Sequence, residues 1–371
     1  MSAPRFLPSL VPVQPTRVRR NYRGGLQLDR LEGVMAPTDG QRPESWIGST
    51  TPARNPGLPP ELNEGLTRVG AINNHWDTLA ALLSENPNFY LGAAHGAHLG
   101  DQLGFLAKLL DSAMRLHVQA HPTAEFSRTR LNSPFGKLEV YYVLGVREGV
   151  TGRIWLGFQR PPARDEWRRI IAQQDIAAMT ACFDPIEVRA GEVWIVPGGL
   201  PHAIGEGVLM VEVMEPSDWV VRCEFEREGV VVPPEGRYMG RGLDFCLDVF
   251  DYTPRSIADV QALCRLTPTL VADGPDWTLE KIVGADRTRC FEIERVRAGR
   301  ACTLPGTGRG TLVIQTHGSG TVRAGSEITP LATGGVCFAA ASATELTFAP
   351  SNPQVGERDA EWLLCRPAPA P

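Results

Sequence analysis

The sequence has no excess of basic residues and no long apolar run. Its 37 lysines and arginines are outnumbered by 42 aspartates and glutamates, which gives a net charge of -5. Because nucleic acids and anionic membranes attract basic proteins, this balance argues against both as partners. No apolar run approaches the ~20 residues that span a bilayer, and the proline-rich first fifteen residues lack the apolar core of a signal peptide. We therefore expect a cytoplasmic protein.

The eight cysteines also lack a pattern. They form no CxxC pair and no regular spacing. Scattered cysteines in mostly apolar surroundings are typical of reduced thiols in a core rather than of a disulfide framework. The length of 371 residues is enough for two domains.

Short stretches rich in Val, Ile, Tyr and Trp, separated by Gly and Pro, run through residues 115–160 and resume at 186–213. This pattern predicts a mainly β protein built from sandwiches or barrels. The composition turns helical at 163–182, which predicts a short helical insert. Two further helices are expected at 242–251 and 257–265, with Ser256 as a possible N-cap of the second.

Three segments allow more than one interpretation. Helical spacing of apolar residues recurs at 76–86 and 100–110, but the second segment also suits a strand. The Gly/Ala-rich segment 92–98 contains His95 and His98, and we interpret it as a mobile loop with two incidental histidines. The segment 43–49 contains an acid, an indole and hydroxyl groups. It is either an edge loop that plugs a barrel or a substrate contact through Glu44 and Trp46.

Residues 334–344 follow the same pattern as residues 191–201: a glycine turn, an apolar strand and then small residues. The repeat places Glu345 where His202 stands, and no Gln-x-His sequence precedes it. The simplest interpretation is two β-barrels of one kind, of which the first carries the site and the second has no metal-binding set.

Polar residues of the first half fall on shared strand faces. Alternate residues of an extended chain point the same way, so Gln119 pairs with His121 and Lys137 pairs with Glu139. His202 follows a Pro-Gly-Gly-Leu-Pro turn at the end of an apolar strand. Burying these groups in a small barrel without a common partner would cost several kcal/mol, and a cation supplies that partner.

Two imidazoles, one carboxylate and one amide oxygen suit zinc, and iron or manganese are also compatible. With a single anionic ligand the site keeps about +1 charge, which favours negative charge on a bound oxygen.

Four motifs then appear in order: Gln-Ala-His-Pro at 119–122, Gly-Lys-Leu-Glu at 136–139, the proline turn at 196–204 and Glu-Val-Met-Glu-Pro-Ser-Asp-Trp-Val-Val-Arg at 212–222. Together they resemble type I mannose-6-phosphate isomerases of the cupin superfamily. The resemblance is strongest from about residue 100 to 225, and weaker in the Glu-Ser-Trp segment at 44–46 and in the second barrel.

This resemblance implies two cupin-type (jelly-roll) barrels with short helical inserts. Residues 1–232 would form the catalytic barrel, and 233–371 a helical connector and a degenerate second barrel. It implies a metal, usually zinc, held by four ligands, and two active-site cations. It also implies the interconversion of mannose 6-phosphate and fructose 6-phosphate through a cis-enediol. The implied ligands are Gln119, His121, Glu139 and His202, and the implied cations are Lys137 and Arg222.

The base that moves the proton between C1 and C2 stays open among Lys137, Glu212 and Asp218. Arg222 is expected to stabilise the enediolate or to hold a substrate oxygen through forked hydrogen bonds.

One residue departs from the family pattern. Family members often have a serine, associated with the phosphate end of the substrate, where this chain has His117. A protonated histidine could bind phosphate, or the sugar could differ. One alternative is therefore an isomerase of an unphosphorylated or different sugar. Two alternatives that do not depend on His117 are a non-catalytic sugar-binding or regulatory cupin and, more distantly, a redox cupin. The oligomeric expectation is a monomer or a homodimer.

Overall fold

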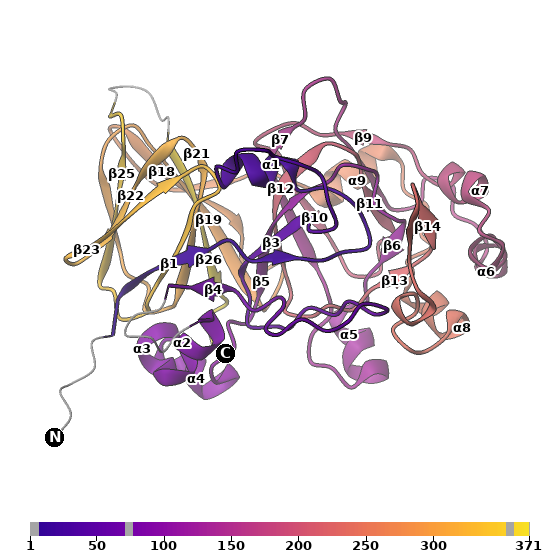
Figure 1. The fold of residues 1–371 in the computed structure, drawn as a ribbon, viewed down its shortest axis with the longest axis horizontal. Coiled ribbons are helices and arrows are strands. Elements are labelled where there is room, and N and C mark those ends of the chain that lie inside the picture. Colours follow the sequence, from indigo (N-terminus) through magenta and orange to yellow (C-terminus); the bar gives the residue numbers. More distant parts are fainter. Residues whose placement is uncertain (1–6, 71–76, 354–359, 371) are drawn as a thin grey trace.

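The computed structural model describes residues 7–70, 77–353 and 360–370, and they form two antiparallel β-barrels side by side (Figure 1). Each barrel consists of a larger and a smaller sheet. The prediction of a mainly β protein is confirmed. In the described residues no helix is long and apolar enough to cross a membrane.

The first barrel contains most of the strands between residues 17 and 266. Its larger sheet has the spatial order β16 (Arg265–Leu266), β10 (Val193–Val196), β7 (Glu139–Val146), β12 (Val208–Met214), β5 (Leu106–Asp111), β3 (Glu44–Gly48) and β2 (Arg17–Val18). Its smaller sheet has the order β13 (Val221–Arg222), β6 (Gln119–Ala120), β11 (His202–Ile204), β8 (Arg153–Leu156) and β9 (Ile186–Glu187). A short hairpin, β14 (Glu226–Arg227) and β15 (Val230–Val231), follows β13.

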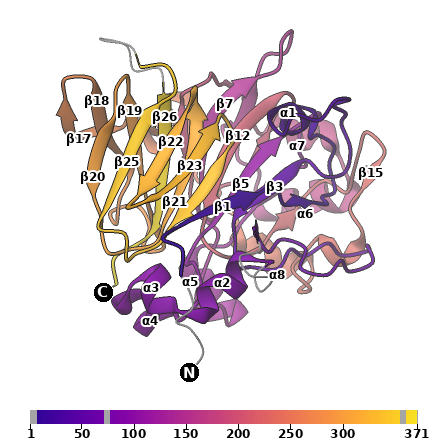
Figure 2. The same cartoon turned by 60° about the vertical axis from the view of Figure 1, so that its left-hand side comes forward.

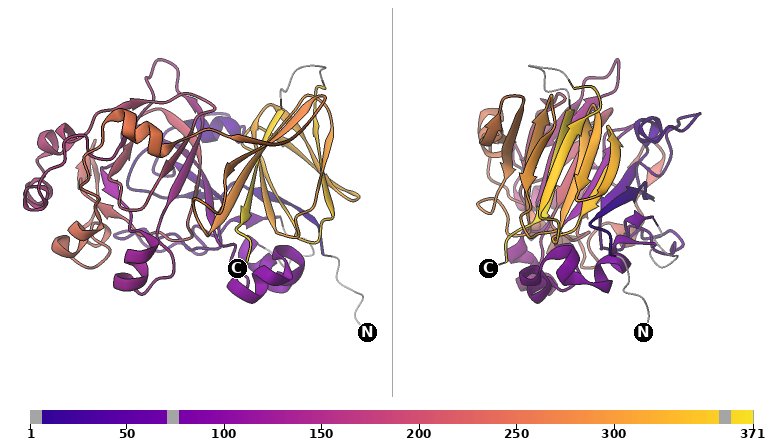
Figure 3. Two further views of the ribbon diagram at one scale, coloured as in Figure 1. Left: turned by 180° about the vertical axis from the view of Figure 1, so that it is seen from behind. Right: turned by 90° about the vertical axis from the view of Figure 1, so that its left-hand side faces the viewer.

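The second barrel is made mainly from the last hundred residues. Its larger sheet has the order β17 (Thr269–Gly274), β18 (Trp277–Val283), β19 (Phe291–Ala298), β26 (Ala360–Pro367), β21 (Thr311–His317), β24 (Val336–Ala339), β1 (Leu10–Gln14) and β4 (Arg68–Val69). Its smaller sheet has the order β20 (Cys302–Pro305), β25 (Glu345–Pro350), β22 (Ser319–Ala324) and β23 (Glu327–Ala332). Figure 3, right, looks onto this barrel.

Strands cross the boundary that we predicted at residue 232. The N-terminal strands β1 (Figure 2) and β4 (Figure 1) extend the large sheet of the second barrel, whereas β16, from beyond residue 232, pairs with β10 in the first. The two barrels are therefore tied together by exchanged strands, and the division at 232 stays a prediction.

Alternation along the large sheet of the first barrel explains where its core and its polar groups lie. Val211 and Val213 belong to the core that the two barrels share, while Glu212 between them points into the first barrel. At Gly48 the barrels approach so closely that an added Cβ would lie 2.5 Å from a methyl carbon of Leu312 on β21. The two large sheets thus pack face to face through a continuous apolar layer.

Helices cover the ends and one flank. They are α1 (Leu26–Leu31), α2 (Leu79–Glu85), α3 (Pro87–Leu91), α4 (Ala93–Leu99), α5 (Ala124–Phe126) with the π-turn Ser127–Leu131, α6 (Arg164–Gln173), α7 (Ile176–Ala181), the 3-10 turn Pro234–Gly236, α8 (Leu243–Cys246) with the 3-10 turn Leu247–Val249, and α9 (Ile257–Cys264). Helices α2 to α4 lie below the second barrel, and α6 to α8 lie at the far end of the first (Figure 1).

Most helix predictions are confirmed. Helices α6 and α7 form the insert at 163–182, α8 and α9 lie in the two later segments, and α2 lies in 76–86. Ser256 caps α9 in a capping box, accepting from the amide of Asp259 while the Asp259 side chain accepts from the Ser256 amide. In the segment 100–110 the strand interpretation is correct from Leu106 onwards, where β5 begins.

Two interpretations are wrong. The segment 92–98 is not a loop, because α4 occupies it and the buried His95 bonds through Nε2 to the carbonyl of Gln102 at 2.7 Å. The segment 43–49 is not an edge loop, because β3 is a fully buried strand between β2 and β5. In both cases long-range packing decides the structure.

Candidate active site

The predicted polar pairs converge between the two sheets of the first barrel. Gln119 on β6 lies directly opposite His202 on β11, and His121 follows two residues after Gln119. Glu139 begins β7 in the opposite sheet, where it pairs with Val196 and Met214. The carboxylate therefore reaches the imidazoles across the interior of the barrel.

The distances between these groups are those of ligands around one ion. Glu139 Oε1 lies 3.1 Å from His121 Nε2, and Glu139 Oε2 lies 3.5 Å from His202 Nε2. The ligand atoms of all three residues lie within 4.8 Å of one another. A tetrahedral zinc ion with bonds near 2.0–2.1 Å separates its ligand atoms by roughly 3.3 Å. Among the described residues no other histidine, cysteine or carboxylate group of three is arranged in this way.

Backbone carbonyls orient both imidazoles toward the centre of the cluster. His121 Nδ1 donates to the carbonyl of Trp219 at 2.8 Å, and His202 Nδ1 donates to that of Leu200 at 2.9 Å. Each ring thus presents the lone pair of Nε2 to the cluster, as ligand histidines do. Burial lowers the pKa of His121 to about 3 and also lowers the pKa of His202, so both rings are neutral. This donor set fits a divalent metal ion.

Gln119 and Lys137 complete the cluster. The amide Nε2 of Gln119 lies 3.3 Å from His202 Nε2, and a half-turn of the amide puts its oxygen there instead. Lys137 Nζ lies 2.9 Å from Glu139 Oε1 and 3.3 Å from His121 Nε2. An ammonium group therefore lies beside the ligand atoms.

A second carboxylate occupies the same interior. Glu212 on β12 lies opposite Lys108 on β5, and Lys108 Nζ is 3.2 Å from Glu212 Oε1. Burial and the neighbouring Glu139 raise the pKa of Glu212 to about 8. The pKa of Glu139 instead lies well below its ordinary value, because His121 and Lys137 outweigh the effect of burial. Two carboxylates whose pKa values are pushed apart are a common arrangement for acid–base chemistry.

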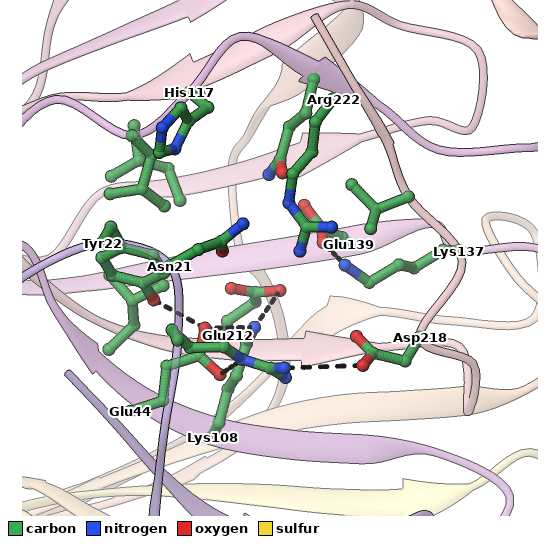
Figure 4. Close-up of a pocket in the computed structure, with 16 residues that line it drawn as sticks. Asn21, Tyr22, Glu44, Lys108, His117, Lys137, Glu139, Glu212, Asp218 and Arg222 are labelled. Carbon is green, nitrogen blue, oxygen red and sulfur yellow. Dashed lines mark hydrogen bonds and ion pairs between the residues drawn. The ribbon is translucent and has the colours of Figure 1, made fainter. Parts of the chain in front are cut away.

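Glu44 connects the polar groups on the far wall of the pocket (Figure 4). Its carboxylate accepts from Arg20 Nε at 2.8 Å, from the Tyr22 hydroxyl at 2.6 Å and from Trp46 Nε1 at 2.7 Å, and Lys108 Nζ lies at 3.2 Å. Burial alone would raise the pKa of Glu44, but Arg20 and Lys108 lower it far below the ordinary range. With four donors on two oxygens, Glu44 holds its neighbours in place.

Trp46 does not reach the pocket. Its side chain is fully buried, packs with Val18, Leu106 and Met214, and lies beneath the guanidinium of Arg20, which is 4.8 Å from the ring centroid. The substrate contact that we considered for Trp46 is wrong: the indole lies on the same face of β3 as Glu44, but it is fully buried in this small core and does not line the pocket. Trp46 instead supports Glu44 through its hydrogen bond.

Arg222, Asp218 and His117 also line the pocket. Arg222 Nη1 donates to the carbonyl of Gly236 at 2.7 Å, and burial lowers its pKa to about 10, so it stays charged. Asp218 Oδ2 lies 3.5 Å from Arg20 Nη1. His117 Nε2 is buried and has no hydrogen-bond partner among the described residues, and burial lowers the pKa of His117 to about 4. The imidazole that we considered for phosphate binding is therefore neutral at pH 7.

The relatives of this chain are sugar phosphate isomerases by name. No family model matches the chain. The mannose-6-phosphate isomerase of Streptococcus mutans is 29% identical over 203 residues, which are 53% of this chain and 61% of that protein. The mannose-6-phosphate isomerase ManA of Bacillus subtilis is 28% identical over 148 residues, 36% of this chain and 42% of that protein. The matched segments thus span less than two thirds of each relative.

Similarity to solved structures covers nearly the whole chain. The mannose 6-phosphate isomerase of Bacillus subtilis superimposes with a TM-score of 0.71 at 18% identity, over 96% of this chain and 99% of that one. The apo form of the Salmonella typhimurium enzyme gives 0.68 at 14% identity, over 97% and 100%. The chain has the fold of these isomerases. The resemblance predicted from the sequence and the cupin-type fold are thereby confirmed.

Some pocket residues were not predicted from the sequence. Arg20, Asn21 and Tyr22 come from an irregular stretch after β2, and nothing in their local pattern marks them. Lys108 could have been predicted as a site residue, because a lysine inside the apolar run of β5 needs a buried partner. Of the residues that were predicted, all except Trp46 lie at the pocket or in the ligand cluster directly behind it.

Proposed function

We propose that the protein is a metal-dependent aldose–ketose isomerase that interconverts mannose 6-phosphate and fructose 6-phosphate. The observation that carries this proposal is the combination, at one end of a pocket, of the buried His121–Glu139–His202 cluster with an ammonium 2.9 Å from Glu139 and a second carboxylate, that of Glu212. A protein that only binds a sugar needs no such acid–base pair. The names of the relatives support the same substrate class.

We assign the metal to Gln119, His121, Glu139 and His202, with zinc as the first candidate and another divalent metal compatible with the ligands. When bound, it would act as a Lewis acid on the substrate oxygens. The neutral rings and their backbone acceptors fit this role without rearrangement.

The side chains of the pocket would move the proton. The reaction takes a proton from C2 of the aldose and returns one to C1, through a cis-enediol of the sugar. All three candidates for the base have a charged neighbour: Asp218 lies 3.5 Å from Arg20, Lys137 lies 2.9 Å from Glu139, and Glu212 lies 3.2 Å from Lys108. Glu212 is favoured, because its raised pKa allows it to take up and release a proton near neutral pH. Arg222 faces the same space and would stabilise the developing negative charge.

The test is a coupled assay with mannose 6-phosphate and fructose 6-phosphate, run with the zinc-loaded protein and again after treatment with chelator. We expect activity that the chelator removes and added metal restores. No activity in the metal-loaded protein would contradict the proposed substrate. Substrate binding without deuterium exchange at C1 or C2 would identify a non-catalytic sugar-binding protein instead.

The neutral, unpartnered His117 favours one alternative, an isomerase of an unphosphorylated or different sugar. It predicts similar rates with mannose and with mannose 6-phosphate. We further infer a cytoplasmic protein without a nucleic-acid partner, active as a monomer or homodimer, in which residues 1–232 hold the catalytic barrel and the barrel within 233–371 binds no metal.

A further inference from the structure

A second cavity opens beside the catalytic pocket. The two share Arg20, Asn21 and Arg222 as lining residues. The second cavity, which we name the outer chamber, continues between the segment 54–58 and the loop 229–236, and its volume is about 310 Å³. The catalytic pocket itself measures about 40 Å³.

These volumes decide what each cavity can hold. A space of about 40 Å³ has room for roughly three water molecules, at about 10–15 Å³ each. It accepts the reacting end of a sugar but not a whole hexose phosphate. Cavities of about 300 Å³ and above are those that enclose complete small molecules. A substrate bound at the catalytic pocket therefore extends into the outer chamber.

The charge of the outer chamber favours an anion. Three arginines line it, and no aspartate or glutamate does, among the described residues. Arg20 is balanced by Glu44 at 2.8 Å and by Asp218 at 3.5 Å. The guanidinium groups of Arg54 and Arg222 form no ion pair in the described part of the chain. Both therefore face the chamber without a carboxylate partner.

Arg54 is held in place by a backbone hydrogen bond and by an aromatic ring. Its backbone amide donates to Asp218 Oδ2 at 3.2 Å, and its guanidinium lies over the Trp219 ring, 5.4 Å from the centroid. Stacking on an aromatic face leaves the N–H groups of a guanidinium free in its plane. Those groups are suited to the oxygens of a phosphate.

We propose that the outer chamber binds the phosphate group of the substrate through Arg54, while the carbonyl end of the sugar lies in the catalytic pocket, near Arg222, which lines both cavities. The proposal rests on the function proposed above and names the phosphate site of the same substrate. If Arg54 binds the phosphate, a protonated His117 is not needed as a phosphate ligand.

The experiment compares Arg54→Ala and Arg54→Glu with Arg68→Ala. Arg68 is an exposed arginine on β4 that pairs with Asp77 at 3.3 Å and lines neither cavity, so it is a matched control. Binding of inorganic phosphate is measured by isothermal titration calorimetry. In parallel, kcat and KM are measured with mannose 6-phosphate and with mannose. Arg54 is exposed, so neither substitution at this position removes core packing.

We expect Arg54→Ala to weaken phosphate binding and to raise KM for mannose 6-phosphate about tenfold, as expected for the loss of one charge-assisted hydrogen bond. Arg54→Glu should have an effect of about a hundredfold, because it also repels the dianion. In both variants the effect on KM exceeds that on kcat, and kcat/KM for mannose 6-phosphate falls relative to that for mannose. Arg68→Ala should match the wild type.

Three results would overturn the phosphate site: a wild-type protein that binds no phosphate, an unchanged phosphate affinity and KM in Arg54→Glu, or a loss of phosphate binding in His117→Ala but not in Arg54→Glu. If the wild type isomerises neither sugar but binds phosphate in a way that depends on Arg54, the anion site stands and the proposed reaction fails. The two proposals are thus tested separately.

Discussion

The turn and strand at residues 191–201 of the first barrel have a close counterpart at 334–344 of the second. Each begins with a glycine at a φ of 85° and continues into a buried four-residue strand, β10 or β24. The residues after the two turns differ, because His202 is buried in the ligand cluster whereas Glu345 is exposed at the start of β25. The turn and the apolar strand specify the fold, and the polar residues that end inside the barrel specify the chemistry.

The interiors of the two barrels show the same contrast. The second is filled by apolar side chains such as Val322, Phe348 and Trp362. The first contains apolar residues at one end and a network of charged residues at the other. Charges buried so deeply are costly unless they are paired, and the first barrel pairs them through Glu44, Lys108 and Glu212.

The largest effect is expected from removing the residue that distinguishes the two turns. His202→Ala should abolish stoichiometric metal binding and lower kcat/KM on the order of a thousandfold, because Lewis-acid stabilisation contributes several kcal/mol. Metal content by mass spectrometry and the coupled assay measure this. The control is Glu345→Ala, the matching position of the second barrel, where we expect no change. Full activity in metal-free His202→Ala would contradict the assignment.

The second prediction concerns Glu212, the second carboxylate inside the first barrel, and its effect on kcat. Glu212→Gln should lower kcat about 10²- to 10⁴-fold, the range typical for loss of a general base. It should also suppress exchange of deuterium between solvent and substrate C1 or C2. Glu187→Gln, at an exposed position on β9, is the control. Undiminished exchange in Glu212→Gln would transfer the role of the base to Lys137 or Asp218.

A smaller effect is expected where the barrels meet. Glu361 on β26 is buried and accepts from the Tyr142 hydroxyl, from Arg297 Nε at 2.7 Å and from Thr316 Oγ1 at 2.7 Å. Glu361→Gln should lower the free energy of unfolding by about 1.5–3 kcal/mol, the range for hydrogen bonds to a charged group. Urea denaturation at pH 7 measures it. We expect one transition for both barrels, and a shift confined to one of two separate transitions would contradict the shared core.

The difference in free energy of unfolding between the wild type and Glu361→Gln should depend on pH, and the sign of this dependence follows from the pKa of Glu361. Although burial opposes ionisation, the hydrogen bonds from Tyr142 and Arg297 lower the pKa of Glu361 below its ordinary value of 4.5. The stabilisation is therefore fully present above about pH 4.5 and is lost as the pH falls through the lower pKa of the folded state. The difference in free energy of unfolding between the wild type and Glu361→Gln should therefore become smaller as the pH falls below about 4.5.

The smallest effect is expected in the connector between the barrels. Ser256→Ala removes the side-chain cap of α9 and should cost about 1 kcal/mol, whereas Ser256→Gly should cost only a few tenths. Neither variant should change kcat, because α9 lies outside the pocket. Equal destabilisation by both substitutions would show that the capping hydroxyl is not the cause.

The part of the site that could be predicted from the sequence follows from local geometry. Gln119 with His121 and Lys137 with Glu139 share faces because side chains alternate along an extended chain, and His202 was marked by its proline turn. Trp46 and Arg20 could not be placed, because their positions depend on β2 and β3 pairing with a distant strand. The helix α4 in the segment 92–98 was missed for a related reason, since glycine and alanine give no apolar periodicity and the helix lies against the second barrel.

The face-to-face packing of the two large sheets also has a mechanical consequence. Strands β3 and β5 carry Glu44 and Lys108 on one side and rest on the second barrel with the other, through Ile47 and Leu109. The second barrel therefore supports, from behind, the two strands that carry Glu44 and Lys108 on the pocket wall. A chain shortened to its first barrel would expose a broad apolar sheet to water and lose the packing that supports Glu44 and Lys108.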